Sequence, residues 1–167
     1  MLKLAINGYG RIGRSILRAL YESEHREGLR IVAINELADA GTVQHLTRYD
    51  STHGRFPLEL SGTESRLRVD GEDIALLQHP EVSGLPWGEL GVDIVLECTG
   101  AFSDRACAQQ HIGSGAGRVL FSQPAQPDVD KTVVYGVNHH VLAAGDTIVS
   151  NASCTTNGIV PVIAALE

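Results

Sequence analysis

A glycine-rich turn between an apolar strand and an amphipathic helix constrains the fold most strongly. Residues 2–7 are mostly apolar and lead into Gly8-Tyr9-Gly10-Arg11-Ile12-Gly13, a G-x-G-x-x-G pattern. Over residues 11–21, apolar side chains recur at three- and four-residue steps, which predicts a helix with one buried face. Residues 29–35 have the pattern of a second strand. A strand, a helix and a strand in succession predict a βαβ unit with parallel strands and a right-handed crossover.

The rest of the chain continues this alternation. We expect helices over 40–47, 104–114 and 158–166, and strands over 92–98, 118–122, 132–135 and 147–150. Residues 58–77 alternate around Asp70-Gly71, a hairpin dipeptide, and predict a small antiparallel insertion. Residues 50–55 are interpreted as a solvated loop. Together these patterns predict an α/β fold with a doubly wound, Rossmann-type, mostly parallel sheet.

Length and composition exclude several classes of protein. The 167 residues are enough for one domain, with little left for a second. The net charge is −7 and no basic cluster is present, so we expect no nucleic-acid partner. The longest apolar run, 159–166, is far shorter than the ~20 residues of a membrane-spanning helix, and no signal peptide is recognisable. Three widely spaced cysteines match neither a disulfide framework nor a metal site, and indicate a reducing cytoplasm.

The glycine turn predicts a dinucleotide-binding site. Gly8 would permit the tight turn, Gly10 would let the backbone approach a pyrophosphate, and Gly13 would let the helix pack against the strand. The helix N-terminus would supply N–H groups to the phosphates. By itself the pattern is weak, because a glycine-rich chain can produce it by chance in a turn that binds nothing. Its position in a βαβ unit makes it specific.

An acidic residue predicts which dinucleotide binds. Glu36 follows the second strand, 23 positions after Gly13, where a carboxylate binds the ribose hydroxyls of NAD. It would repel the 2′-phosphate of NADP, so NAD is the predicted cofactor. Thr99-Gly100 and Ser122 follow other strands at their carboxyl ends, where ligands bind in open α/β sheets. We predict no metal site, since the adjacent His139 and His140 point apart and lack a third ligand.

The polar run Ser150–Gly158 is a second candidate site. Cys154 would lie at or near a helix N-terminus, whose partial positive charge stabilises a thiolate. The hydroxyls of Ser153 and Thr155 on either side suit a phosphate or an oxyanion. The local sequence fits helix capping beside an incidental cysteine equally well. Cys98 and Cys107 lie in apolar surroundings, so we expect them to be buried.

The two motifs together resemble the phosphorylating glyceraldehyde-3-phosphate dehydrogenase family. They are Ile6-Asn7-Gly8-Tyr9-Gly10-Arg11-Ile12-Gly13-Arg14 and Ser150-Asn151-Ala152-Ser153-Cys154-Thr155-Thr156-Asn157. The similarity spans essentially the whole chain and corresponds to the NAD-binding half of the family. Within the family, residues 33–39, 45–56, 120–124 and 132–138 look more like erythrose-4-phosphate dehydrogenase. The glycolytic enzymes usually carry Asn-Asp where this chain has Asn35-Glu36-Leu37.

The resemblance implies a role for each matching residue. Cys154 would be the nucleophile that adds to the aldehyde, and after hydride transfer to NAD it would carry a thioester. Ser153 and Thr155 would contact the substrate or its phosphate. The implied cofactor-binding residues are Asn7, Gly8, Gly10 and Gly13, with Arg11 and Ile12 at the pyrophosphate, Glu36 at the adenosine ribose, Thr99 and Gly100 at the adenine side, and Ser122 at the nicotinamide side.

The resemblance also implies a substrate and an assembly. The substrate would be a sugar-phosphate aldehyde, with erythrose 4-phosphate oxidised to 4-phosphoerythronate for pyridoxal phosphate synthesis. The alternatives are glyceraldehyde-3-phosphate dehydrogenase of glycolysis and a catalytically silent NAD-binding module. The full-length protein would be a cytoplasmic homotetramer.

The expected domain organisation is an NAD-binding Rossmann domain over 1–150, followed by the cysteine motif and first helix of a truncated catalytic domain over 151–167. The family's second cysteine is replaced here by Gly158. Its general-base histidine and the other phosphate sites would lie beyond residue 167. We therefore do not expect full dehydrogenase activity from these 167 residues alone.

Overall fold

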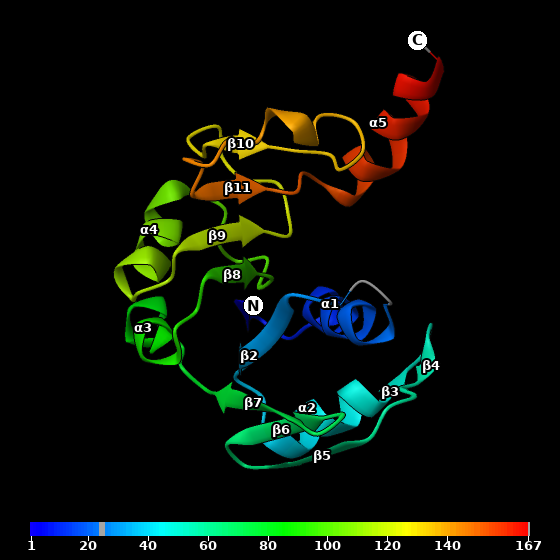
Figure 1. Cartoon of the computed structure of the whole chain (residues 1–167), viewed down its shortest axis with the longest axis vertical. Coiled ribbons are helices and arrows are strands. Elements are labelled where there is room, and N and C mark those ends of the chain that lie inside the picture. Colours follow the sequence, from blue (N-terminus) through cyan, green and yellow to red (C-terminus); the bar gives the residue numbers. More distant parts are fainter. Residues whose placement is uncertain (24–25, 167) are drawn as a thin grey trace.

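A computed structural model describes residues 1–23 and 26–166; Glu167, the end of the predicted segment 151–167, lies outside them, as do two residues of the polar segment after the first helix. The described residues contain a curved nine-stranded sheet with the order β10-β11-β9-β8-β1-β2-β7-β6-β5 (Figure 1). Its parallel strands are β1 (Leu2–Asn7), β2 (Leu29–Asn35), β7 (Glu72–Leu77), β8 (Ile94–Glu97), β9 (Arg118–Phe121), β10 (Lys131–Thr132) and β11 (Ile148–Ser150). The predicted mostly parallel Rossmann-type sheet is confirmed.

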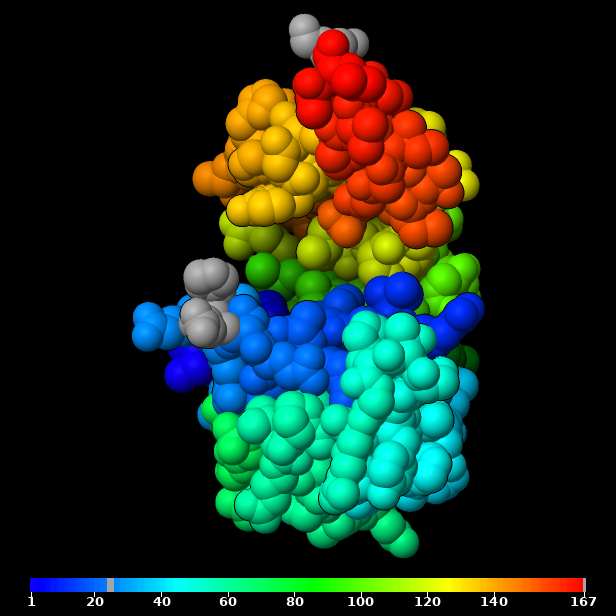
Figure 2. All heavy atoms as spheres, turned by 90° about the vertical axis from the view of Figure 1, so that its right-hand side faces the viewer, coloured from blue at the N-terminus to red at the C-terminus, as the bar shows by residue number. Residues whose placement is uncertain are grey.

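Helices cover both faces of this sheet, as a doubly wound fold requires. Helices α1 (Arg11–Glu22) and α2 (Ala40–Arg48) lie on one side, and α3 (Trp87–Leu90) and α4 (Arg105–Gly113) on the other. Two short 3₁₀ helices, η1 (Val82–Gly84) and η2 (His139–Val141), lie in connecting segments. The last helix, α5 (Cys154–Leu166), projects away from the sheet (Figures 1 and 2). Within the described residues, no helix combines the length and apolar character that crossing a membrane would need.

The central strand β1 shows why the sheet is buried on both faces. Successive side chains of a strand point to opposite faces. Ile6 packs with Leu17 of α1 in one apolar cluster, whereas Ala5 packs with Trp87 and Val95 in another. A parallel strand covered on both sides carries apolar residues in succession rather than in alternation, which explains the apolar run at the start of the sequence.

The antiparallel segment is predicted correctly as a hairpin but extends the main sheet. Strands β5 (Leu60–Thr63) and β6 (Arg66–Val69) pair antiparallel, and so do β6 and β7. Asp70 and Gly71 connect β6 to β7 with φ of 50° and 79°, the positive values that a tight two-residue hairpin turn requires. Strand β7 then pairs in parallel with β2. Its carboxyl end therefore lies at the same edge as those of β1 and β2.

Three local predictions are wrong. The expected strand over 132–135 ends at Thr132, because the Asn138 side chain accepts a hydrogen bond from the Val134 N–H at 2.6 Å and closes a turn. The helix expected to begin at Gly158 begins at Cys154. Within the predicted loop 50–55, β3 (Tyr49–Asp50) and β4 (Gly54–Arg55) form a two-residue antiparallel pair that remains largely solvent-exposed.

Candidate functional site

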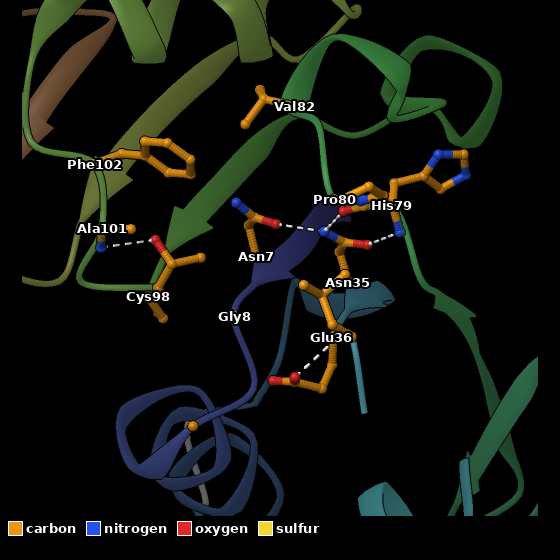
Figure 3. A pocket seen from close by; sticks show the side chains of 13 residues that line it. Asn7, Gly8, Asn35, Glu36, His79, Pro80, Val82, Cys98, Ala101 and Phe102 are labelled. Carbon is orange, nitrogen blue, oxygen red and sulfur yellow. Dashed lines mark hydrogen bonds between the residues drawn. The ribbon is translucent and has the colours of Figure 1, made fainter. Parts of the chain in front are cut away.

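A pocket of about 370 Å³ opens at the carboxyl ends of β1, β2, β7 and β8. This is the edge at which ligands bind in open α/β sheets. Five of the predicted cofactor-binding residues line the pocket: Asn7, Gly8, Gly10, Glu36 and Thr99. Figure 3 shows Asn7 and Glu36 on one side of the pocket, with Val82 and Phe102 on the other.

The three glycines of the turn serve three different purposes. Gly8 has a φ of +88°, and a Cβ there would lie 2.6 Å from the backbone nitrogen of Thr99. A Cβ at Gly13 would overlap the carbonyl oxygen of Gly8, so this glycine permits close packing of α1 against the turn. A Cβ at Gly10 would meet no atom within 4 Å. Gly10 therefore faces open space, as approach of a pyrophosphate to the backbone requires.

The N-terminus of α1 presents free hydrogen-bond donors beside Gly10. Gly10 is the N-cap and offers no side chain, and the first helical hydrogen bond runs from the Arg14 N–H to the Gly10 carbonyl at 3.1 Å. Within the described part of the chain, the N–H groups of Arg11, Ile12 and Gly13 have no acceptor. These three residues do not line the pocket itself. Their backbone donors and the helix dipole suit an anionic ligand such as a phosphate.

Glu36 is held in place at the edge of the pocket, beside the glycine turn. Its Oε2 accepts from the N–H of Tyr9 at 2.8 Å, and its Oε1 accepts from the N–H groups of Leu37 at 2.8 Å and Ala38 at 3.2 Å. The carboxylate is thus fixed by three backbone donors and remains half-exposed at the pocket edge. It retains lone pairs for further donors, such as the two hydroxyls of a ribose.

Sequence reasoning missed Asn35 and His79, two polar residues that line the pocket. The Asn35 amide donates to Asn7 Oδ1 at 2.8 Å and to the His79 carbonyl at 3.0 Å, and its Oδ1 accepts from the His79 N–H at 2.9 Å (Figure 3). His79 follows β7, so it reaches the pocket only because β7 runs parallel to β2. The available signals were the position of Asn35 at the end of an apolar strand and that of His79 shortly after another.

Three predicted residues lie on neighbouring segments. Thr99 lines the pocket, and Gly100 beside it is exposed with a φ of +73° and does not line it. Ser122 follows β9 and lies outside the pocket, where its hydroxyl donates to Gln123 Oε1 at 2.8 Å. Since β9 is the neighbour of β8, Ser122 extends the edge on which the pocket lies.

The cysteine segment lies farther along the same sheet edge. It follows β11, two strands from β8, and Cys154 is the exposed first residue of α5. The Ser153 hydroxyl caps this helix by accepting from the Thr156 N–H at 2.9 Å, and Thr155 Oγ1 lies 4.0 Å from Cys154 Sγ. None of these residues lines the pocket beside β1.

The other two cysteines are buried, as predicted. Burial raises the pKa of the Cys98 thiol to about 11 and that of the Cys107 thiol to about 12. A thiol with so high a pKa is a poor nucleophile near neutral pH. The exposed Cys154 is therefore the best placed of the three to react with a ligand.

Comparison with known proteins, like the pocket, indicates a dinucleotide-binding domain. Residues 2–105 match the family model described as glyceraldehyde 3-phosphate dehydrogenase, NAD binding domain. Two proteins of Cupriavidus necator, named glyceraldehyde-3-phosphate dehydrogenase, plasmid, and glyceraldehyde-3-phosphate dehydrogenase, chromosomal, are each 54% identical to this chain over 166 residues. The alignments cover 99% of the chain and 49% of each relative. The chain thus spans about half the length of the curated relatives it matches.

Proposed function

The chain belongs to the glyceraldehyde-3-phosphate dehydrogenase family and carries its NAD-binding domain, and from this premise we propose that it forms the cofactor-binding part of a dehydrogenase that oxidises a phosphorylated aldehyde. The observation that carries this proposal is the joint geometry of Gly10 and Glu36. Gly10 leaves open space beside free N–H donors, and the Glu36 carboxylate is held in the same pocket by the neighbouring Tyr9 N–H.

The cofactor would lie across the carboxyl edge of the sheet. Its pyrophosphate would bind at Gly10 and the backbone of Arg11 and Ile12, and its adenosine ribose would bind at Glu36. The adenine side would lie near Thr99 and Gly100. The nicotinamide would extend past Ser122 toward β11. This direction is supported by the sheet order, which puts β9 and β11 successively beyond β8.

Cys154 would be the catalytic nucleophile. Its thiolate would add to the aldehyde carbon, and loss of hydride from that carbon would leave a thioester on Sγ. NAD, when bound, supplies the acceptor for the hydride. Ser153 and Thr155 would contact the substrate or its phosphate. Exposure of Cys154 at the start of α5 supports this role, because the helix N-terminus stabilises negative charge.

Glyceraldehyde 3-phosphate is the substrate that the comparisons favour. Both relatives are named for it, at 54% identity over nearly the whole chain. The initial interpretation, erythrose 4-phosphate, rests on sequence segments such as 33–39, and no relative described above carries that name. We therefore rank erythrose 4-phosphate second, with an NAD-binding module without catalysis as the remaining alternative.

The predicted domain organisation forms part of this proposal. Residues 1–150 would be the NAD-binding domain, and 151–167 would begin a catalytic domain. In the structure, α5 projects from the sheet rather than packing on it (Figure 2), which supports a division near residue 150. The homotetrameric assembly and the cytoplasmic location remain predictions.

Two measurements test the proposed function. Calorimetric titration of the 167-residue chain with NAD should give saturable binding with one site per chain. The complete product of the gene should then be assayed for NADH formation with glyceraldehyde 3-phosphate and with erythrose 4-phosphate. A higher kcat/KM for glyceraldehyde 3-phosphate supports the proposal, and a higher value for erythrose 4-phosphate reverses the ranking. NAD binding without turnover of either aldehyde would identify a silent module, and absence of NAD binding would refute the proposal.

A further inference from the structure

Glu97, the last residue of β8, lies fully buried beneath the pocket. Its Oε2 accepts from Asn7 Nδ2 at 2.6 Å and from His111 Nε2 at 3.1 Å, and its Oε1 accepts from the Thr99 N–H at 2.8 Å and from the Thr99 hydroxyl. Among the described residues no lysine or arginine pairs with it. A buried carboxylate is costly unless donors surround it. The donors around Glu97 therefore have to be held in fixed directions.

Trp87 fixes the direction of the hydrogen bonds from one side. Its indole N–H can only donate, and it donates to His111 Nδ1 at 2.9 Å. His111 therefore carries its ring proton on Nε2 and presents it to Glu97. Because His111 is 0% exposed, no solvent is available to support the other tautomer.

The His79 backbone fixes the direction from the other side. Its N–H and carbonyl bind the two ends of the Asn35 amide, so the orientation of Asn35 is determined. Asn35 Nδ2 then donates to Asn7 Oδ1, which turns Asn7 Nδ2 toward Glu97 (Figure 3 shows the Asn35 contacts).

Thr99 completes the set of donors. Its hydroxyl oxygen accepts from the Ala101 N–H at 3.1 Å, which leaves the hydroxyl hydrogen for Glu97. All four groups around the carboxylate thus present a hydrogen to it. Both oxygens of the Glu97 side chain thus serve as hydrogen-bond acceptors for two donors each.

Three of these four donors belong to Asn7 and Thr99, which line the pocket, although Glu97 itself does not. Thr99 also packs against the glycine turn, since a Cβ on Gly8 would lie 2.6 Å from the Thr99 nitrogen. We propose that Glu97 is a positioning residue for cofactor binding, whose carboxylate holds Asn7 and Thr99 in the geometry that NAD requires. The inference rests on the proposed placement of NAD in this pocket.

Glu97→Gln tests the inference because it keeps the size and removes one acceptor. The glutamine NH₂ must face either Asn7 and His111 or the two donors of Thr99. Asn7 and His111 cannot reverse, since the His79 backbone and Trp87 fix their orientations. The Thr99 N–H is a backbone donor and cannot accept. We expect the variant to fold and to bind NAD at least tenfold more weakly, measured by calorimetry at a temperature at which circular dichroism shows complete folding.

Val95→Ala is the matched control. Val95 is 0% exposed, lies two residues earlier on the same strand face, and does not line the pocket. Its truncation leaves a cavity that lowers stability, and NAD affinity should stay within twofold of the unmodified chain. Unchanged affinity in Glu97→Gln would overturn the inference, and so would an equal loss of affinity in Val95→Ala. Failure of the unmodified chain to bind NAD would instead refute the proposed function.

Two measurements on the unmodified chain keep the inference testable if Glu97→Gln does not fold. Nitrogen NMR should find the His111 ring proton on Nε2, and a proton on Nδ1 would contradict the network. Hydrogen exchange of the Thr99 amide should be slow before NAD is added, because Glu97 already holds it. Exchange as fast as in an unfolded peptide would overturn positioning by Glu97.

Discussion

The backbone N–H of Tyr9 donates to Glu36 Oε2 at 2.8 Å, so the carboxylate that follows β2 is attached to the glycine turn that follows β1. One side chain thereby sets the distance between the predicted ribose and pyrophosphate subsites. The N–H groups of Leu37 and Ala38 hold the other carboxylate oxygen. The pocket edge is therefore organised before a ligand arrives.

Glu36 should determine the choice between NAD and NADP. The unmodified chain should bind NAD at least tenfold more tightly than NADP, because the carboxylate accepts from the ribose hydroxyls and repels a 2′-phosphate. Glu36→Ala should narrow that ratio by about tenfold, or about 1.4 kcal/mol. Calorimetric titration of both cofactors measures it, with the exposed Glu59→Ala as a control for lost charge. Equal affinities in the unmodified chain would contradict the assignment.

A side chain added at Gly10 should affect NAD binding, whereas one added at Gly13 should affect stability. Gly10→Val places atoms in open space, so the chain should stay folded and lose NAD binding. Gly13→Ala drives a methyl group into the Gly8 carbonyl, so it should lower the free energy of unfolding by about 1–3 kcal/mol. Thermal denaturation and NAD titration of both variants separate the two effects. A folded Gly10→Val chain with normal affinity would show that the pyrophosphate binds elsewhere.

The sequence best predicts those parts of the site that are formed by residues close together in the chain. Gly8, Gly10 and Glu36 could be found because a dinucleotide-binding turn imposes fixed spacings along a single βαβ unit. The capping of α4 is equally local, since Asp104 accepts from the Cys107 N–H three residues later at 2.8 Å.

The rest depends on contacts between distant segments. His79 reaches the pocket because β7 pairs with β2, and alternation within residues 58–77 carries no information about that neighbour. Glu97 lies in what the sequence shows as one apolar strand. Its partners His111 and Asn7 come from α4 and β1, so no spacing along the chain indicates the network.

Asp130 should make the free energy of unfolding fall at acidic pH. Its carboxylate forms an ion pair with the Arg105 guanidinium and accepts hydrogen bonds from the N–H groups of Thr147 at 2.8 Å and Ile148 at 3.0 Å. The hydrogen bond from Arg105 and the two N–H groups hold the pKa of this carboxyl well below its usual range. Because the folded pKa is lower than the unfolded one, the stabilisation is complete above the unfolded value of about 3.9 and is lost as pH falls toward the folded value.

Asp130→Asn should therefore lower the free energy of unfolding by about 1–2 kcal/mol at neutral pH and have a smaller effect in acid. Urea denaturation at several pH values measures both. Glu89→Gln, an exposed carboxylate on α3, serves as the control. A loss of stability in Asp130→Asn that is the same at every pH would argue against this source of acid sensitivity.

The exposed apolar face of α5 should cause self-association. Ile159, Val162 and Ile163 are 52%, 59% and 50% exposed on one projecting helix (Figure 2). Sedimentation should show mass increasing with concentration. The double variant Ile159→Glu, Ile163→Lys, which places opposite charges one helical turn apart, should remain monomeric. Leu46→Gln, at an exposed apolar residue of α2, should not change the association. A monomer at every concentration would contradict the prediction.

Cys154 should react with iodoacetamide before either other cysteine. It is exposed at the first position of α5, so its sulfur is accessible to the reagent. Burial protects Cys98 and Cys107 and raises the pKa of their thiols to about 11 and about 12. Mass spectrometry of a partly alkylated sample should therefore find label on Cys154 at least tenfold in excess of the other two, and Cys154→Ser should abolish the fast phase. Label that appears first on Cys98 or Cys107 would count against Cys154 as the nucleophile.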